Sequence, residues 1–335
     1  MTIYDISEKA GVSIATVSRV LNGGKNVREQ TMEKVLAVIQ ECGYTPNAFA
    51  RGLGLNTMKT IGFLCADSSD MYTAKAIFYL EQLLRENNYN SILCCSGYEL
   101  ENRKSSMKLL LRQNVDAIIL VGSSYVYDDP AMNQYITDAA AKTPILIMNA
   151  QMEADNVYSV LSDDYTSVYQ ATEYMLASGI KDIAFFYNAH SYSCTRKLEG
   201  YKQAMLDACL PDVQPLLRYY DGSHQDIPAM AENLKQAVDA GLSFKGIIAA
   251  DDMLALGAIK YAHEQNLCLP DDLAVIGYNN SMLTRICQPE LTSIDNKLET
   301  LCHHLIHVLL GILDGEEMPP VSVFSGELVK RDTTK

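Results

Sequence analysis

Residues 11–23 read GVSIATVSRVLNG, a stretch that holds one short helix between two glycines. Ser13 stands where a helix cap is expected, and the glycines limit the helix at both ends. Its inward face is formed by the apolar residues Val17, Val20 and Leu21. The opposite face is left with Ile14, Ala15, Ser18, Arg19 and Asn22. Small polar side chains and an arginine on a short helix are typical of a helix that enters the major groove of DNA, although a helical hairpin with a solvated face has the same pattern.

Two further short helices are predicted around this stretch. Thr2 caps the first, with Asp5 at the position of a capping box, and Gly11 ends it. Its apolar face carries Ile3, Ile6 and Ala10. The other helix covers residues 28–42 and is stopped by a glycine. Its inner face is formed by Met32, Val35, Leu36 and Ile39. The sequence therefore predicts a small head of three helices.

A segment of different composition follows the head. Residues 46–60 read PNAFARGLGLNTMKT, with a proline at the start and two glycines flanking Leu53. Such a segment is a poor helix on its own, because each glycine weakens a helix by about 0.8–1 kcal/mol relative to alanine. It is interpreted as a linker.

From Thr60 onward, short apolar runs alternate with amphipathic helical stretches such as residues 74–87 and 164–178. The runs are IGFLCA, SILCCS, AIILVG, PILIMN, IAFFYN, GIIAAD and LAVIGY. Strands that alternate with helices predict parallel sheets in doubly wound units, and about nine strands fit two such sheets better than one. Ligands of these folds bind beyond the carboxyl ends of the strands.

The composition is that of an ordinary globular protein of two or three domains, with 335 residues, 48% hydrophobic and 20% charged. The charge is unevenly spread. Residues 1–59 carry seven Lys and Arg against five Asp and Glu, a net charge of +2, which leaves −16 for the rest of a chain whose total is −14. An acidic body is repelled by nucleic acid, whereas this head is not.

Nine scattered cysteines, with Cys94 and Cys95 adjacent, indicate free thiols in a reducing compartment. No apolar run reaches the length of a membrane span, and the first residues lack the pattern of a secretory signal. We therefore expect a cytoplasmic protein.

The sequence resembles the lactose/galactose repressor family of bacterial transcriptional regulators along essentially its whole length. The resemblance rests on TIYDISEKAGVSIATVSRVLNG, YTPNAFARGL, KTIGF, VDAIILVGSS, SDDYTSVYQATEYMLASG, KLEGYKQAM, ADDMLALGAIKYAHEQNLCLPDDLAVIGY, PELTSI and LVKRDTT, in this order. It implies a small all-α helix-turn-helix head plus an α/β body of two doubly wound subdomains, like periplasmic binding proteins. The implied divisions are 1–45 for the DNA-binding domain, 46–59 for a hinge and 60–333 for the effector-binding and dimerisation domain. Within the body, the subdomains are expected at about 60–160 with 294–320, and 161–293 with 321–333.

The resemblance also implies the residues that contact DNA. Base edges would be read by Ile14, Ala15 and Arg19, the arginine offering two donors to a guanine. Phosphates would be held by Thr2, Tyr4, Ser13, Thr16, Ser18 and Asn22. In the hinge, Ala50 and Leu53 would contact the minor groove, with Leu53 as a wedge between base pairs.

A small effector is expected in the cleft between the subdomains. Matched by position, its candidate ligands are Asp70, Tyr72, Ser123, Asn149, Lys197, Asp251 and Asn279. Two of these depart from the family, whose members often carry Arg in place of Lys197 and Asp in place of Asn279. Because that pair grips vicinal hydroxyls, the departures weaken the expectation of a sugar. Each strand-end polar residue can also serve as a helix cap.

The sequence thus predicts a repressor of a carbohydrate-utilisation operon that binds a pseudo-palindromic DNA operator as a homodimer and responds to a sugar or sugar derivative. The alternative is the same DNA-binding regulator controlled by a protein partner, as in the family's catabolite-control members. A solute-binding protein for transport is a further alternative. It would need a signal peptide and would lack a DNA-binding head, and this sequence meets neither expectation. No heptad of leucines follows Val329 to support a tetramer.

Enzyme signatures are not found: the sequence lacks a dinucleotide-binding fingerprint, a P-loop, a nucleophile elbow and an H-E-x-x-H motif. No cofactor and no metal are expected. The one metal-like cluster is Cys302, His303, His304 and His307. Its amphipathic spacing favours a partly exposed helix over a metal site.

Overall fold

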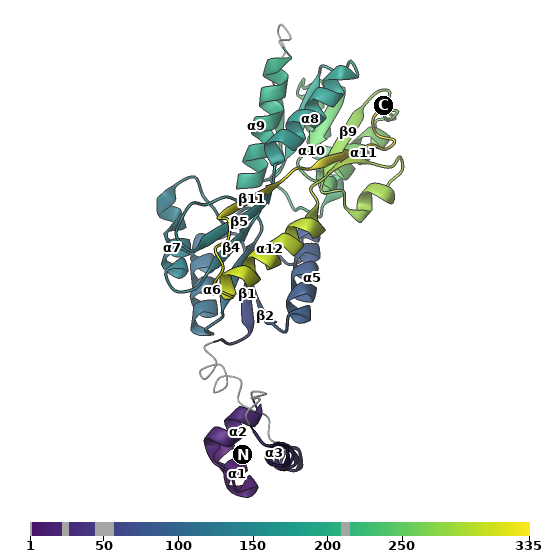
Figure 1. Cartoon of the computed structure of the whole chain (residues 1–335). Coiled ribbons are helices and arrows are strands. Elements are labelled where there is room, and N and C mark those ends of the chain that lie inside the picture. The colour runs from purple at the N-terminus through teal and green to yellow at the C-terminus, as the bar shows by residue number, and fades with distance from the viewer. Residues whose placement is uncertain (1, 22–26, 44–56, 209–214) are drawn as a thin grey trace.

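The computed structural model describes residues 2–21, 27–43, 57–208 and 215–335. Three helices near the N-terminus form a small head, and the rest forms an α/β body with two sheets (Figure 1). The predicted fold class, a helix-turn-helix head on a doubly wound body, is confirmed. Two sheets are present as expected, but each has six strands, more than the predicted total.

The head consists of α1 (Ile3–Ala10), α2 (Ile14–Leu21) and α3 (Glu29–Glu41). Its core is formed by the buried side chains of Ile6, Ala10, Val17, Val20 and Val35. The predicted capping box of Thr2 and Asp5 is present, and Gly11 ends α1 at a φ of 61°. Met32 and Leu36, expected on the inner face of α3, are 37% and 48% exposed. Two short partner helices cover only a narrow stripe of α3, so the predicted inner face is too wide.

The first sheet of the body is parallel, with strand order β11-β5-β4-β3-β1-β2. Its strands are β1 (Thr60–Cys65), β2 (Asn90–Cys95), β3 (Ala117–Val121), β4 (Ile145–Met148), β5 (Val157–Ser162) and β11 (Val321–Phe324). Its helices are α5 (Met71–Glu86), α6 (Leu100–Arg112), α7 (Gln134–Ala140) and α12 (Leu298–Leu313), with a 3₁₀ turn at Pro130–Asn133. Apolar residues of α5 and α12 pack on one face, and those of α6 and α7 on the other.

The second sheet has the order β12-β10-β9-β8-β6-β7, in which only β12 runs antiparallel to its neighbour. Its strands are β6 (Ile183–Tyr187), β7 (Leu216–Tyr219), β8 (Gly246–Ala249), β9 (Ala274–Tyr278), β10 (Thr292–Asp295) and β12 (Glu327–Val329). Its helices are α8 (Asp164–Ala177), α9 (Tyr192–Asp207), α10 (Ile227–Asp239) and α11 (Asp252–Glu264), with a 3₁₀ turn at Met282–Arg285. Gly200 allows α9 to approach α8, because a Cβ there would lie 2.2 Å from the carbonyl oxygen of Tyr165.

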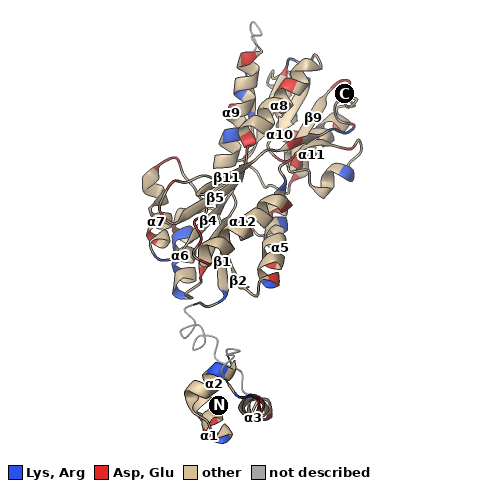
Figure 2. Ribbon diagram, in the orientation of Figure 1, with Lys and Arg blue, Asp and Glu red and all other residues tan. Residues whose placement is uncertain are grey.

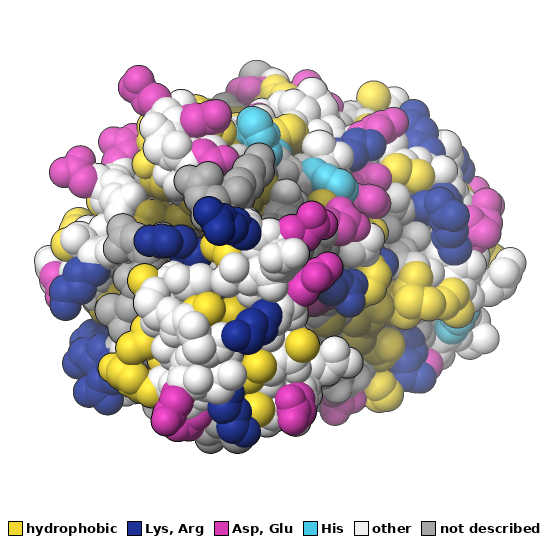
Figure 3. All heavy atoms as spheres, turned by 60° about the horizontal axis from the view of Figure 1, so that its bottom comes forward, with side chains coloured by type: hydrophobic (Ala, Val, Ile, Leu, Met, Phe, Trp, Pro, Cys, Tyr) yellow, Lys and Arg dark blue, Asp and Glu magenta, His cyan; other side chains and the backbone are white. Residues whose placement is uncertain are grey.

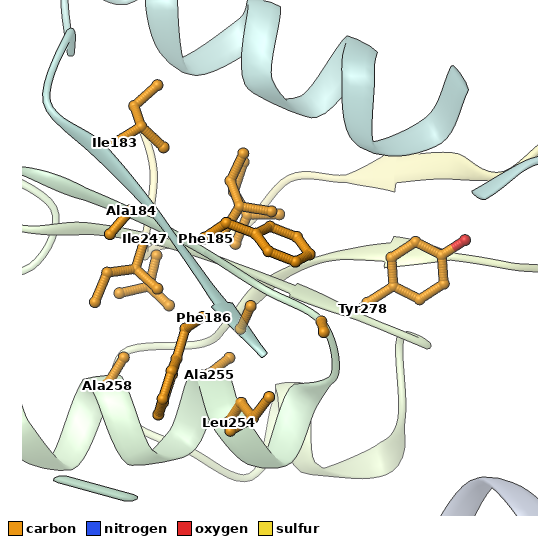
Figure 4. Close-up of a cluster of buried hydrophobic side chains, with 14 of the residues drawn as sticks. Ile183, Ala184, Phe185, Phe186, Ile247, Leu254, Ala255, Ala258 and Tyr278 are labelled. Atoms are coloured by element: carbon orange, nitrogen blue, oxygen red, sulfur yellow. The ribbon is translucent and has the colours of Figure 1, made fainter. Parts of the chain in front are cut away.

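The core of the second subdomain shows how these unbroken apolar strands are used. Phe185 and Phe186 are neighbours on β6 and point to opposite faces of the sheet (Figure 4). Phe186 lies toward α11, beside Ala255 and Ala258, whereas the ring of Phe185 stacks on Tyr201 of α9 at 5.4 Å. A strand covered by helices on both faces needs apolar residues at every position, which is the pattern that made it visible in the sequence.

The chain passes between the two sheets after β5, after β10 and after β11. Two expected subdomain boundaries are therefore wrong. Residues 321–324, assigned to the second subdomain, form β11 and pair with β5 in the first sheet. Residues 294–295, assigned to the first subdomain, belong to β10 of the second sheet. Both strands are short and lack a purely apolar run, so the pattern did not show which sheet they join.

Candidate functional site

The exposed side of α2 carries the predicted base-reading residues. Val17 and Val20 are buried in the head, which turns Ile14, Ala15 and Arg19 toward solvent. Ile14 is 40% exposed although it is apolar. The structure thus brings these three side chains together on one exposed face of a short helix, the arrangement that a groove-reading helix requires.

Most of the predicted phosphate-holding residues lie at the starts of α1 and α2, and Ser18 lies further along α2. The backbone N–H of Thr2 donates to Asp5 Oδ2 at 2.7 Å, and the Thr2 hydroxyl donates to the same atom at 3.1 Å. Ser13 Oγ accepts from the N–H of Thr16 at 3.2 Å and lies 2.9 Å from the Thr16 hydroxyl. Tyr4 is 68% exposed on α1. Ser18 is half-buried on α2. Helix starts that present hydroxyl and N–H groups suit the binding of phosphate.

Three predicted DNA-contacting residues, Asn22, Ala50 and Leu53, lie outside the described residues. Their assignments stay predictions from the sequence.

A cleft of about 1270 Å³ lies between the two subdomains, at the carboxyl ends of strands from both sheets. All seven predicted effector ligands line it: Asp70, Tyr72, Ser123, Asn149, Lys197, Asp251 and Asn279. Residues more than two hundred positions apart in the sequence are thereby placed around one cavity. The strand-end rule for doubly wound sheets accounts for this convergence.

On the first-subdomain wall, Asp70 caps α5 by accepting from the N–H of Thr73 at 2.8 Å. The Tyr72 hydroxyl accepts from Asn149 Nδ2 at 2.5 Å. Asn149 is 7% exposed and has a φ of 62°, a conformation that asparagine tolerates better than most residues. Ser123 Oγ donates across the cleft to Ser191 Oγ at 3.0 Å. These bonds hold the wall in place and join it to the opposite subdomain.

On the second-subdomain wall, Lys197 is 7% exposed. Its Nζ donates to the carbonyl oxygen of Ala250 at 2.9 Å and lies 3.6 Å from the centroid of the Tyr278 ring. Asp251 caps α11 by accepting from the N–H of Leu254 at 2.8 Å. Asn279 Oδ1 accepts from Asn296 Nδ2 at 3.1 Å. Both predicted aspartates, Asp70 and Asp251, therefore serve as helix caps in addition to lining the cleft.

Within the described residues, four buried side-chain polar atoms have no hydrogen-bond partner, and all four belong to residues that line this cleft. They are Arg103 Nε, Asn149 Oδ1, Ser281 Oγ and Asn296 Oδ1. A buried polar atom without a partner costs about 1–3 kcal/mol. Two of these atoms are amide oxygens and one is a hydroxyl oxygen, all on residues that line one cavity.

Burial raises the pKa of three carboxyl groups around the cleft, those of Asp164, Asp251 and Asp252. The charge of Lys197 opposes the rise in the pKa of the first two. The pKa of Asp252 is about 6. Its oxygens accept from Ser293 Oγ at 2.6 Å and from the N–H of Ser281 at 2.7 Å. Gly277 leaves room for this carboxyl group, because a Cβ there would lie 2.4 Å from it.

Comparison with known proteins shows the class of protein to which this head and cleft belong. Residues 2–47 match the family described as bacterial regulatory proteins, lacI family, and residues 172–334 match a periplasmic binding protein-like domain. A helix-turn-helix transcriptional regulator of Lachnoclostridium phytofermentans is 47% identical, and the alignment covers 100% of this chain and 99% of that protein. The chain belongs to the LacI family.

Other relatives and solved structures agree with this assignment. The regulator RegA of Clostridium saccharobutylicum is 32% identical to this LacI-family chain over 99% of each. The Lac repressor dimer bound to operator and the anti-inducer ONPF has the same fold, with a TM-score of 0.88, 24% identity and coverage of 100% and 99%. A complex of the regulator CelR with cellobiose has a TM-score of 0.70 at 25% identity, with 99% of each chain covered.

As a member of the LacI family, the protein is a transcriptional regulator with a DNA-binding helix-turn-helix domain, and not an enzyme. In the part of the chain that the structure describes, no helix is long and apolar enough to span a membrane. The cluster on α12 is divided between core and surface: Cys302 is buried, whereas His303 and His307 are exposed. His304 is half-buried, and its Nε2 lies 2.8 Å from Ser322 Oγ.

Several cleft residues of this LacI-family regulator were missed in the sequence, and the reasons differ. Asn188 ends an apolar run, so it carried the same strand-end signal as its neighbours, and it donates to Asp251 Oδ2 at 3.3 Å. Asn296 follows β10, a strand without an unbroken apolar run. Arg103 lies within α6 and gave no signal. Its guanidinium donates to the Ser124 carbonyl and, at 2.7 Å, to the Tyr127 hydroxyl.

The raised pKa of Asp252 leads to a prediction about stability and pH. Because the folded protein holds this proton more tightly than the unfolded chain, the stabilisation is full below about pH 4 and is lost as the pH rises through about 6. We expect the free energy of unfolding of the wild type to fall relative to that of Asp252→Asn across this window, by roughly 1.4 kcal/mol for each pH unit. The melting temperature of the wild type should fall with it.

Thermal melting of both proteins between pH 4 and pH 7 measures this difference. Asp164 is unchanged in the variant and cancels in the comparison, whereas Asp251 is coupled to Asp252, so the measured difference belongs to the adjacent pair. Asp239→Asn, at an exposed position on α10, is the matched control and should follow the wild type. Parallel curves for the wild type and Asp252→Asn would contradict the prediction.

Proposed function

We propose that this regulator is a repressor that binds a pseudo-palindromic operator as a homodimer and responds to a small polyhydroxylated effector in the cleft. The observation that carries the proposal is that the buried, unpartnered polar atoms of the described residues all belong to residues that line this cavity, namely Asn149, Ser281, Asn296 and Arg103. The seven candidates carried over from the family line the same cavity. A carbohydrate-utilisation operon is the proposed target.

The chemistry of the cleft favours a neutral polyol over a multiply charged anion. The free oxygens of Asn149 and Asn296 accept hydrogen bonds, as sugar hydroxyls require. The acidic residues that line the cleft are Asp67, Asp70, Asp251, Asp252, Asp295 and Glu299. The basic residues are Lys75, Arg103, Lys197 and Lys297. This excess of acidic groups disfavours a dianion. The cellobiose complex of CelR, which shares the fold, supports the choice of a sugar.

An effector in this position can control the spacing of the subdomains. The two walls already touch through Ser123 and Ser191, and Gln225 Nε2 donates to Ser69 Oγ at 3.2 Å. A ligand that contacts both walls binds the closed arrangement more tightly than the open one. Its differential affinity shifts the equilibrium, and the hinge that leads to the head transmits the shift to the DNA.

Control by a protein partner is the second candidate. Catabolite control protein A of Priestia megaterium is 30% identical over 88% of this chain and 87% of that protein. In that case the cleft would have no small ligand of its own, and a partner protein would have to bind elsewhere on the body.

A melting screen separates the two candidates. The purified regulator is heated with a panel of neutral sugars, sugar acids and nucleosides, each at millimolar concentration. We expect one class of neutral sugar to raise the melting temperature, because binding to the folded state alone stabilises by about 2.7 kcal/mol at a hundredfold excess over Kd. Asn149→Ala should abolish that rise. A panel without any stabilising compound would favour the protein partner.

A further inference from the structure

A second hollow, of about 490 Å³, lies on the first subdomain and is rimmed by three cations. Its lining consists of Lys108, Leu111, Arg112, Asn114, Val115, Lys142 and Thr143. No acidic side chain is among these described residues, and the three cations are all exposed. We call Lys108, Arg112 and Lys142 the basic corner.

The basic corner lies at the end of the body that receives the chain from the head. Asn114 and Val115 in its lining lead directly to Asp116, whose carboxylate accepts from Thr57 Oγ1 at 3.0 Å and from the N–H of Met58 at 2.9 Å. The described body begins at Thr57. In Figure 1, the lower end of α6 lies beside the start of β1, close to where the described body begins. The basic corner therefore lies beside Thr57 and Met58, where the described body begins after the head.

The charge of this corner differs from that of the body around it. Residues from 60 onward carry a large acidic excess, yet α6 shows blue Lys and Arg segments in Figure 2. Figure 3 shows Lys and Arg side chains at several places on this side of the molecule, among acidic and apolar ones. None of the ion pairs in the described ranges involves Lys108, Arg112 or Lys142. Lys104, the nearest basic residue on the same helix face, is paired with Glu101 at 2.7 Å.

The position of these cations is not explained by the stability of α6. Lys108 and Arg112 are four residues apart on one helix face, where like charges destabilise a helix by about 0.2–0.5 kcal/mol. The helix dipole favours Arg112 in the last turn, but it does not account for Lys108 or for Lys142, which lies beyond α7. A cluster of exposed, unpaired cations around a hollow suits a polyanion outside the protein.

We propose that the basic corner binds the phosphate backbone of DNA that flanks the operator half-site. This inference rests on the proposed function, because it requires the heads to hold an operator near the hinge end of the body. Operator DNA is then the polyanion next to this corner, and three cations rimming one hollow can neutralise consecutive phosphates. In a dimer, the two copies of the corner would contact the two flanks. The interaction adds affinity without adding sequence specificity.

The test compares operators that share the same central sequence but carry flanks of increasing length. The wild type should bind the long-flanked operator about tenfold more tightly than the minimal one at low salt, since each neutralised phosphate contributes through counterion release. Replacement of the corner by Lys108→Gln, Arg112→Gln and Lys142→Gln together should remove that gain. The slope of log affinity against log salt on the long operator should also decrease by about 0.9 for each phosphate that the variant no longer neutralises.

Matched controls remove the same charge elsewhere. The triple variant Lys181→Gln, Lys235→Gln and Lys245→Gln changes three exposed lysines of the second subdomain, and it should keep the dependence on flank length. Equal losses in the two triple variants would overturn the proposal, because they would reflect net charge alone. A wild type whose affinity ignores flank length would overturn it as well.

Two further outcomes have a definite meaning. If inorganic phosphate raises the melting temperature of the wild type but not of the corner variant, and flanks have no effect, the corner is a small-anion site and the proposal is wrong. If the wild type binds no operator of any length, the proposed function has failed. Normal binding of the minimal operator by the corner variant, together with loss of the flank effect, supports the proposal.

Discussion

Replacement of Arg19 by alanine is expected to weaken operator binding by about 1–3 kcal/mol for each half-site. Arg19 is exposed on α2, beside Ile14 and Ala15, while Val17 and Val20 anchor the helix in the head. Its guanidinium offers two parallel donors to a guanine, and no other residue on this face of α2 carries such a group. Because a symmetric operator has two half-sites, the loss on it should be about twice the loss on an isolated half-site.

The measurement is binding to the operator and to single-base variants of it, at one fixed salt concentration. Arg19→Ala should lose preference at one base pair per half-site, whereas Arg19→Lys should retain non-specific affinity but lose that preference, since an ammonium lacks the planar pair of donors. Tyr4→Phe, which removes an exposed hydroxyl assigned to phosphate, should weaken all sequences alike. Uniform weakening by both Arg19 variants would assign Arg19 to the backbone instead.

The head could be predicted closely because its signals are local. A capping box at Thr2, a glycine with positive φ at position 11 and apolar residues at helical spacing each depend on neighbours within a turn or two. The exposure of Met32 and Leu36 was not predictable in the same way. It depends on how much of α3 the other two helices cover, which is a property of packing and not of periodicity.

In the body, strands with an unbroken apolar run were visible in the sequence and the others were not, whatever their burial: β2 was predicted although none of its residues is buried, and β5 was not predicted although most of its residues are. β3 and β4 are apolar throughout, whereas β7 alternates along its length and β12 has three residues. The sequence cannot show which sheet such strands join, because that choice is made by pairing with distant residues. This is why residues 321–324 were assigned to the wrong subdomain.

The cleft residues were predicted by matching positions to the family, and the outcome shows what such a resemblance can and cannot do. It placed residues such as Ser123 and Asn279 around one cavity without knowledge of the topology. It could not show that the Lys197 ammonium is already held by Ala250 and Tyr278, or that Asn149 keeps a free oxygen. A family resemblance predicts which positions line the cleft. It does not predict the hydrogen-bond partners of their side chains, because these depend on side-chain geometry.

Lys197 links the parts of the second subdomain that form the floor of the cleft. It comes from α9, donates to the carbonyl oxygen of Ala250 at the end of β8, and lies over the Tyr278 ring at the end of β9. An ammonium has three N–H donors. One donates to Ala250 while the ammonium lies over the Tyr278 ring, and we predict that another donates to a hydroxyl of the effector. The same charge lies near the buried carboxyl groups of Asp164 and Asp251.

Lys197→Met is therefore expected to abolish the response to the effector while operator binding without effector stays within about twofold of the wild type. Methionine fills a similar volume but leaves the effector hydroxyl without its donor, which costs about 1–3 kcal/mol at a buried site. It also removes the cation that opposes the raised pKa of two buried carboxyl groups, those of Asp164 and Asp251. The measurement is operator affinity with and without the sugar found in the melting screen.

Two variants make this prediction specific to the ammonium. Lys197→Arg keeps a cation and its donors, so it should retain part of the response. Tyr278→Phe keeps the ring beneath Lys197 but removes the hydroxyl that is hydrogen-bonded to Asp164, so it should respond nearly as the wild type does. A full response in Lys197→Met would place the effector away from this wall. A lost response in Tyr278→Phe, with a normal one in Lys197→Met, would move the controlling contact from the lysine to the buried Tyr278–Asp164 pair.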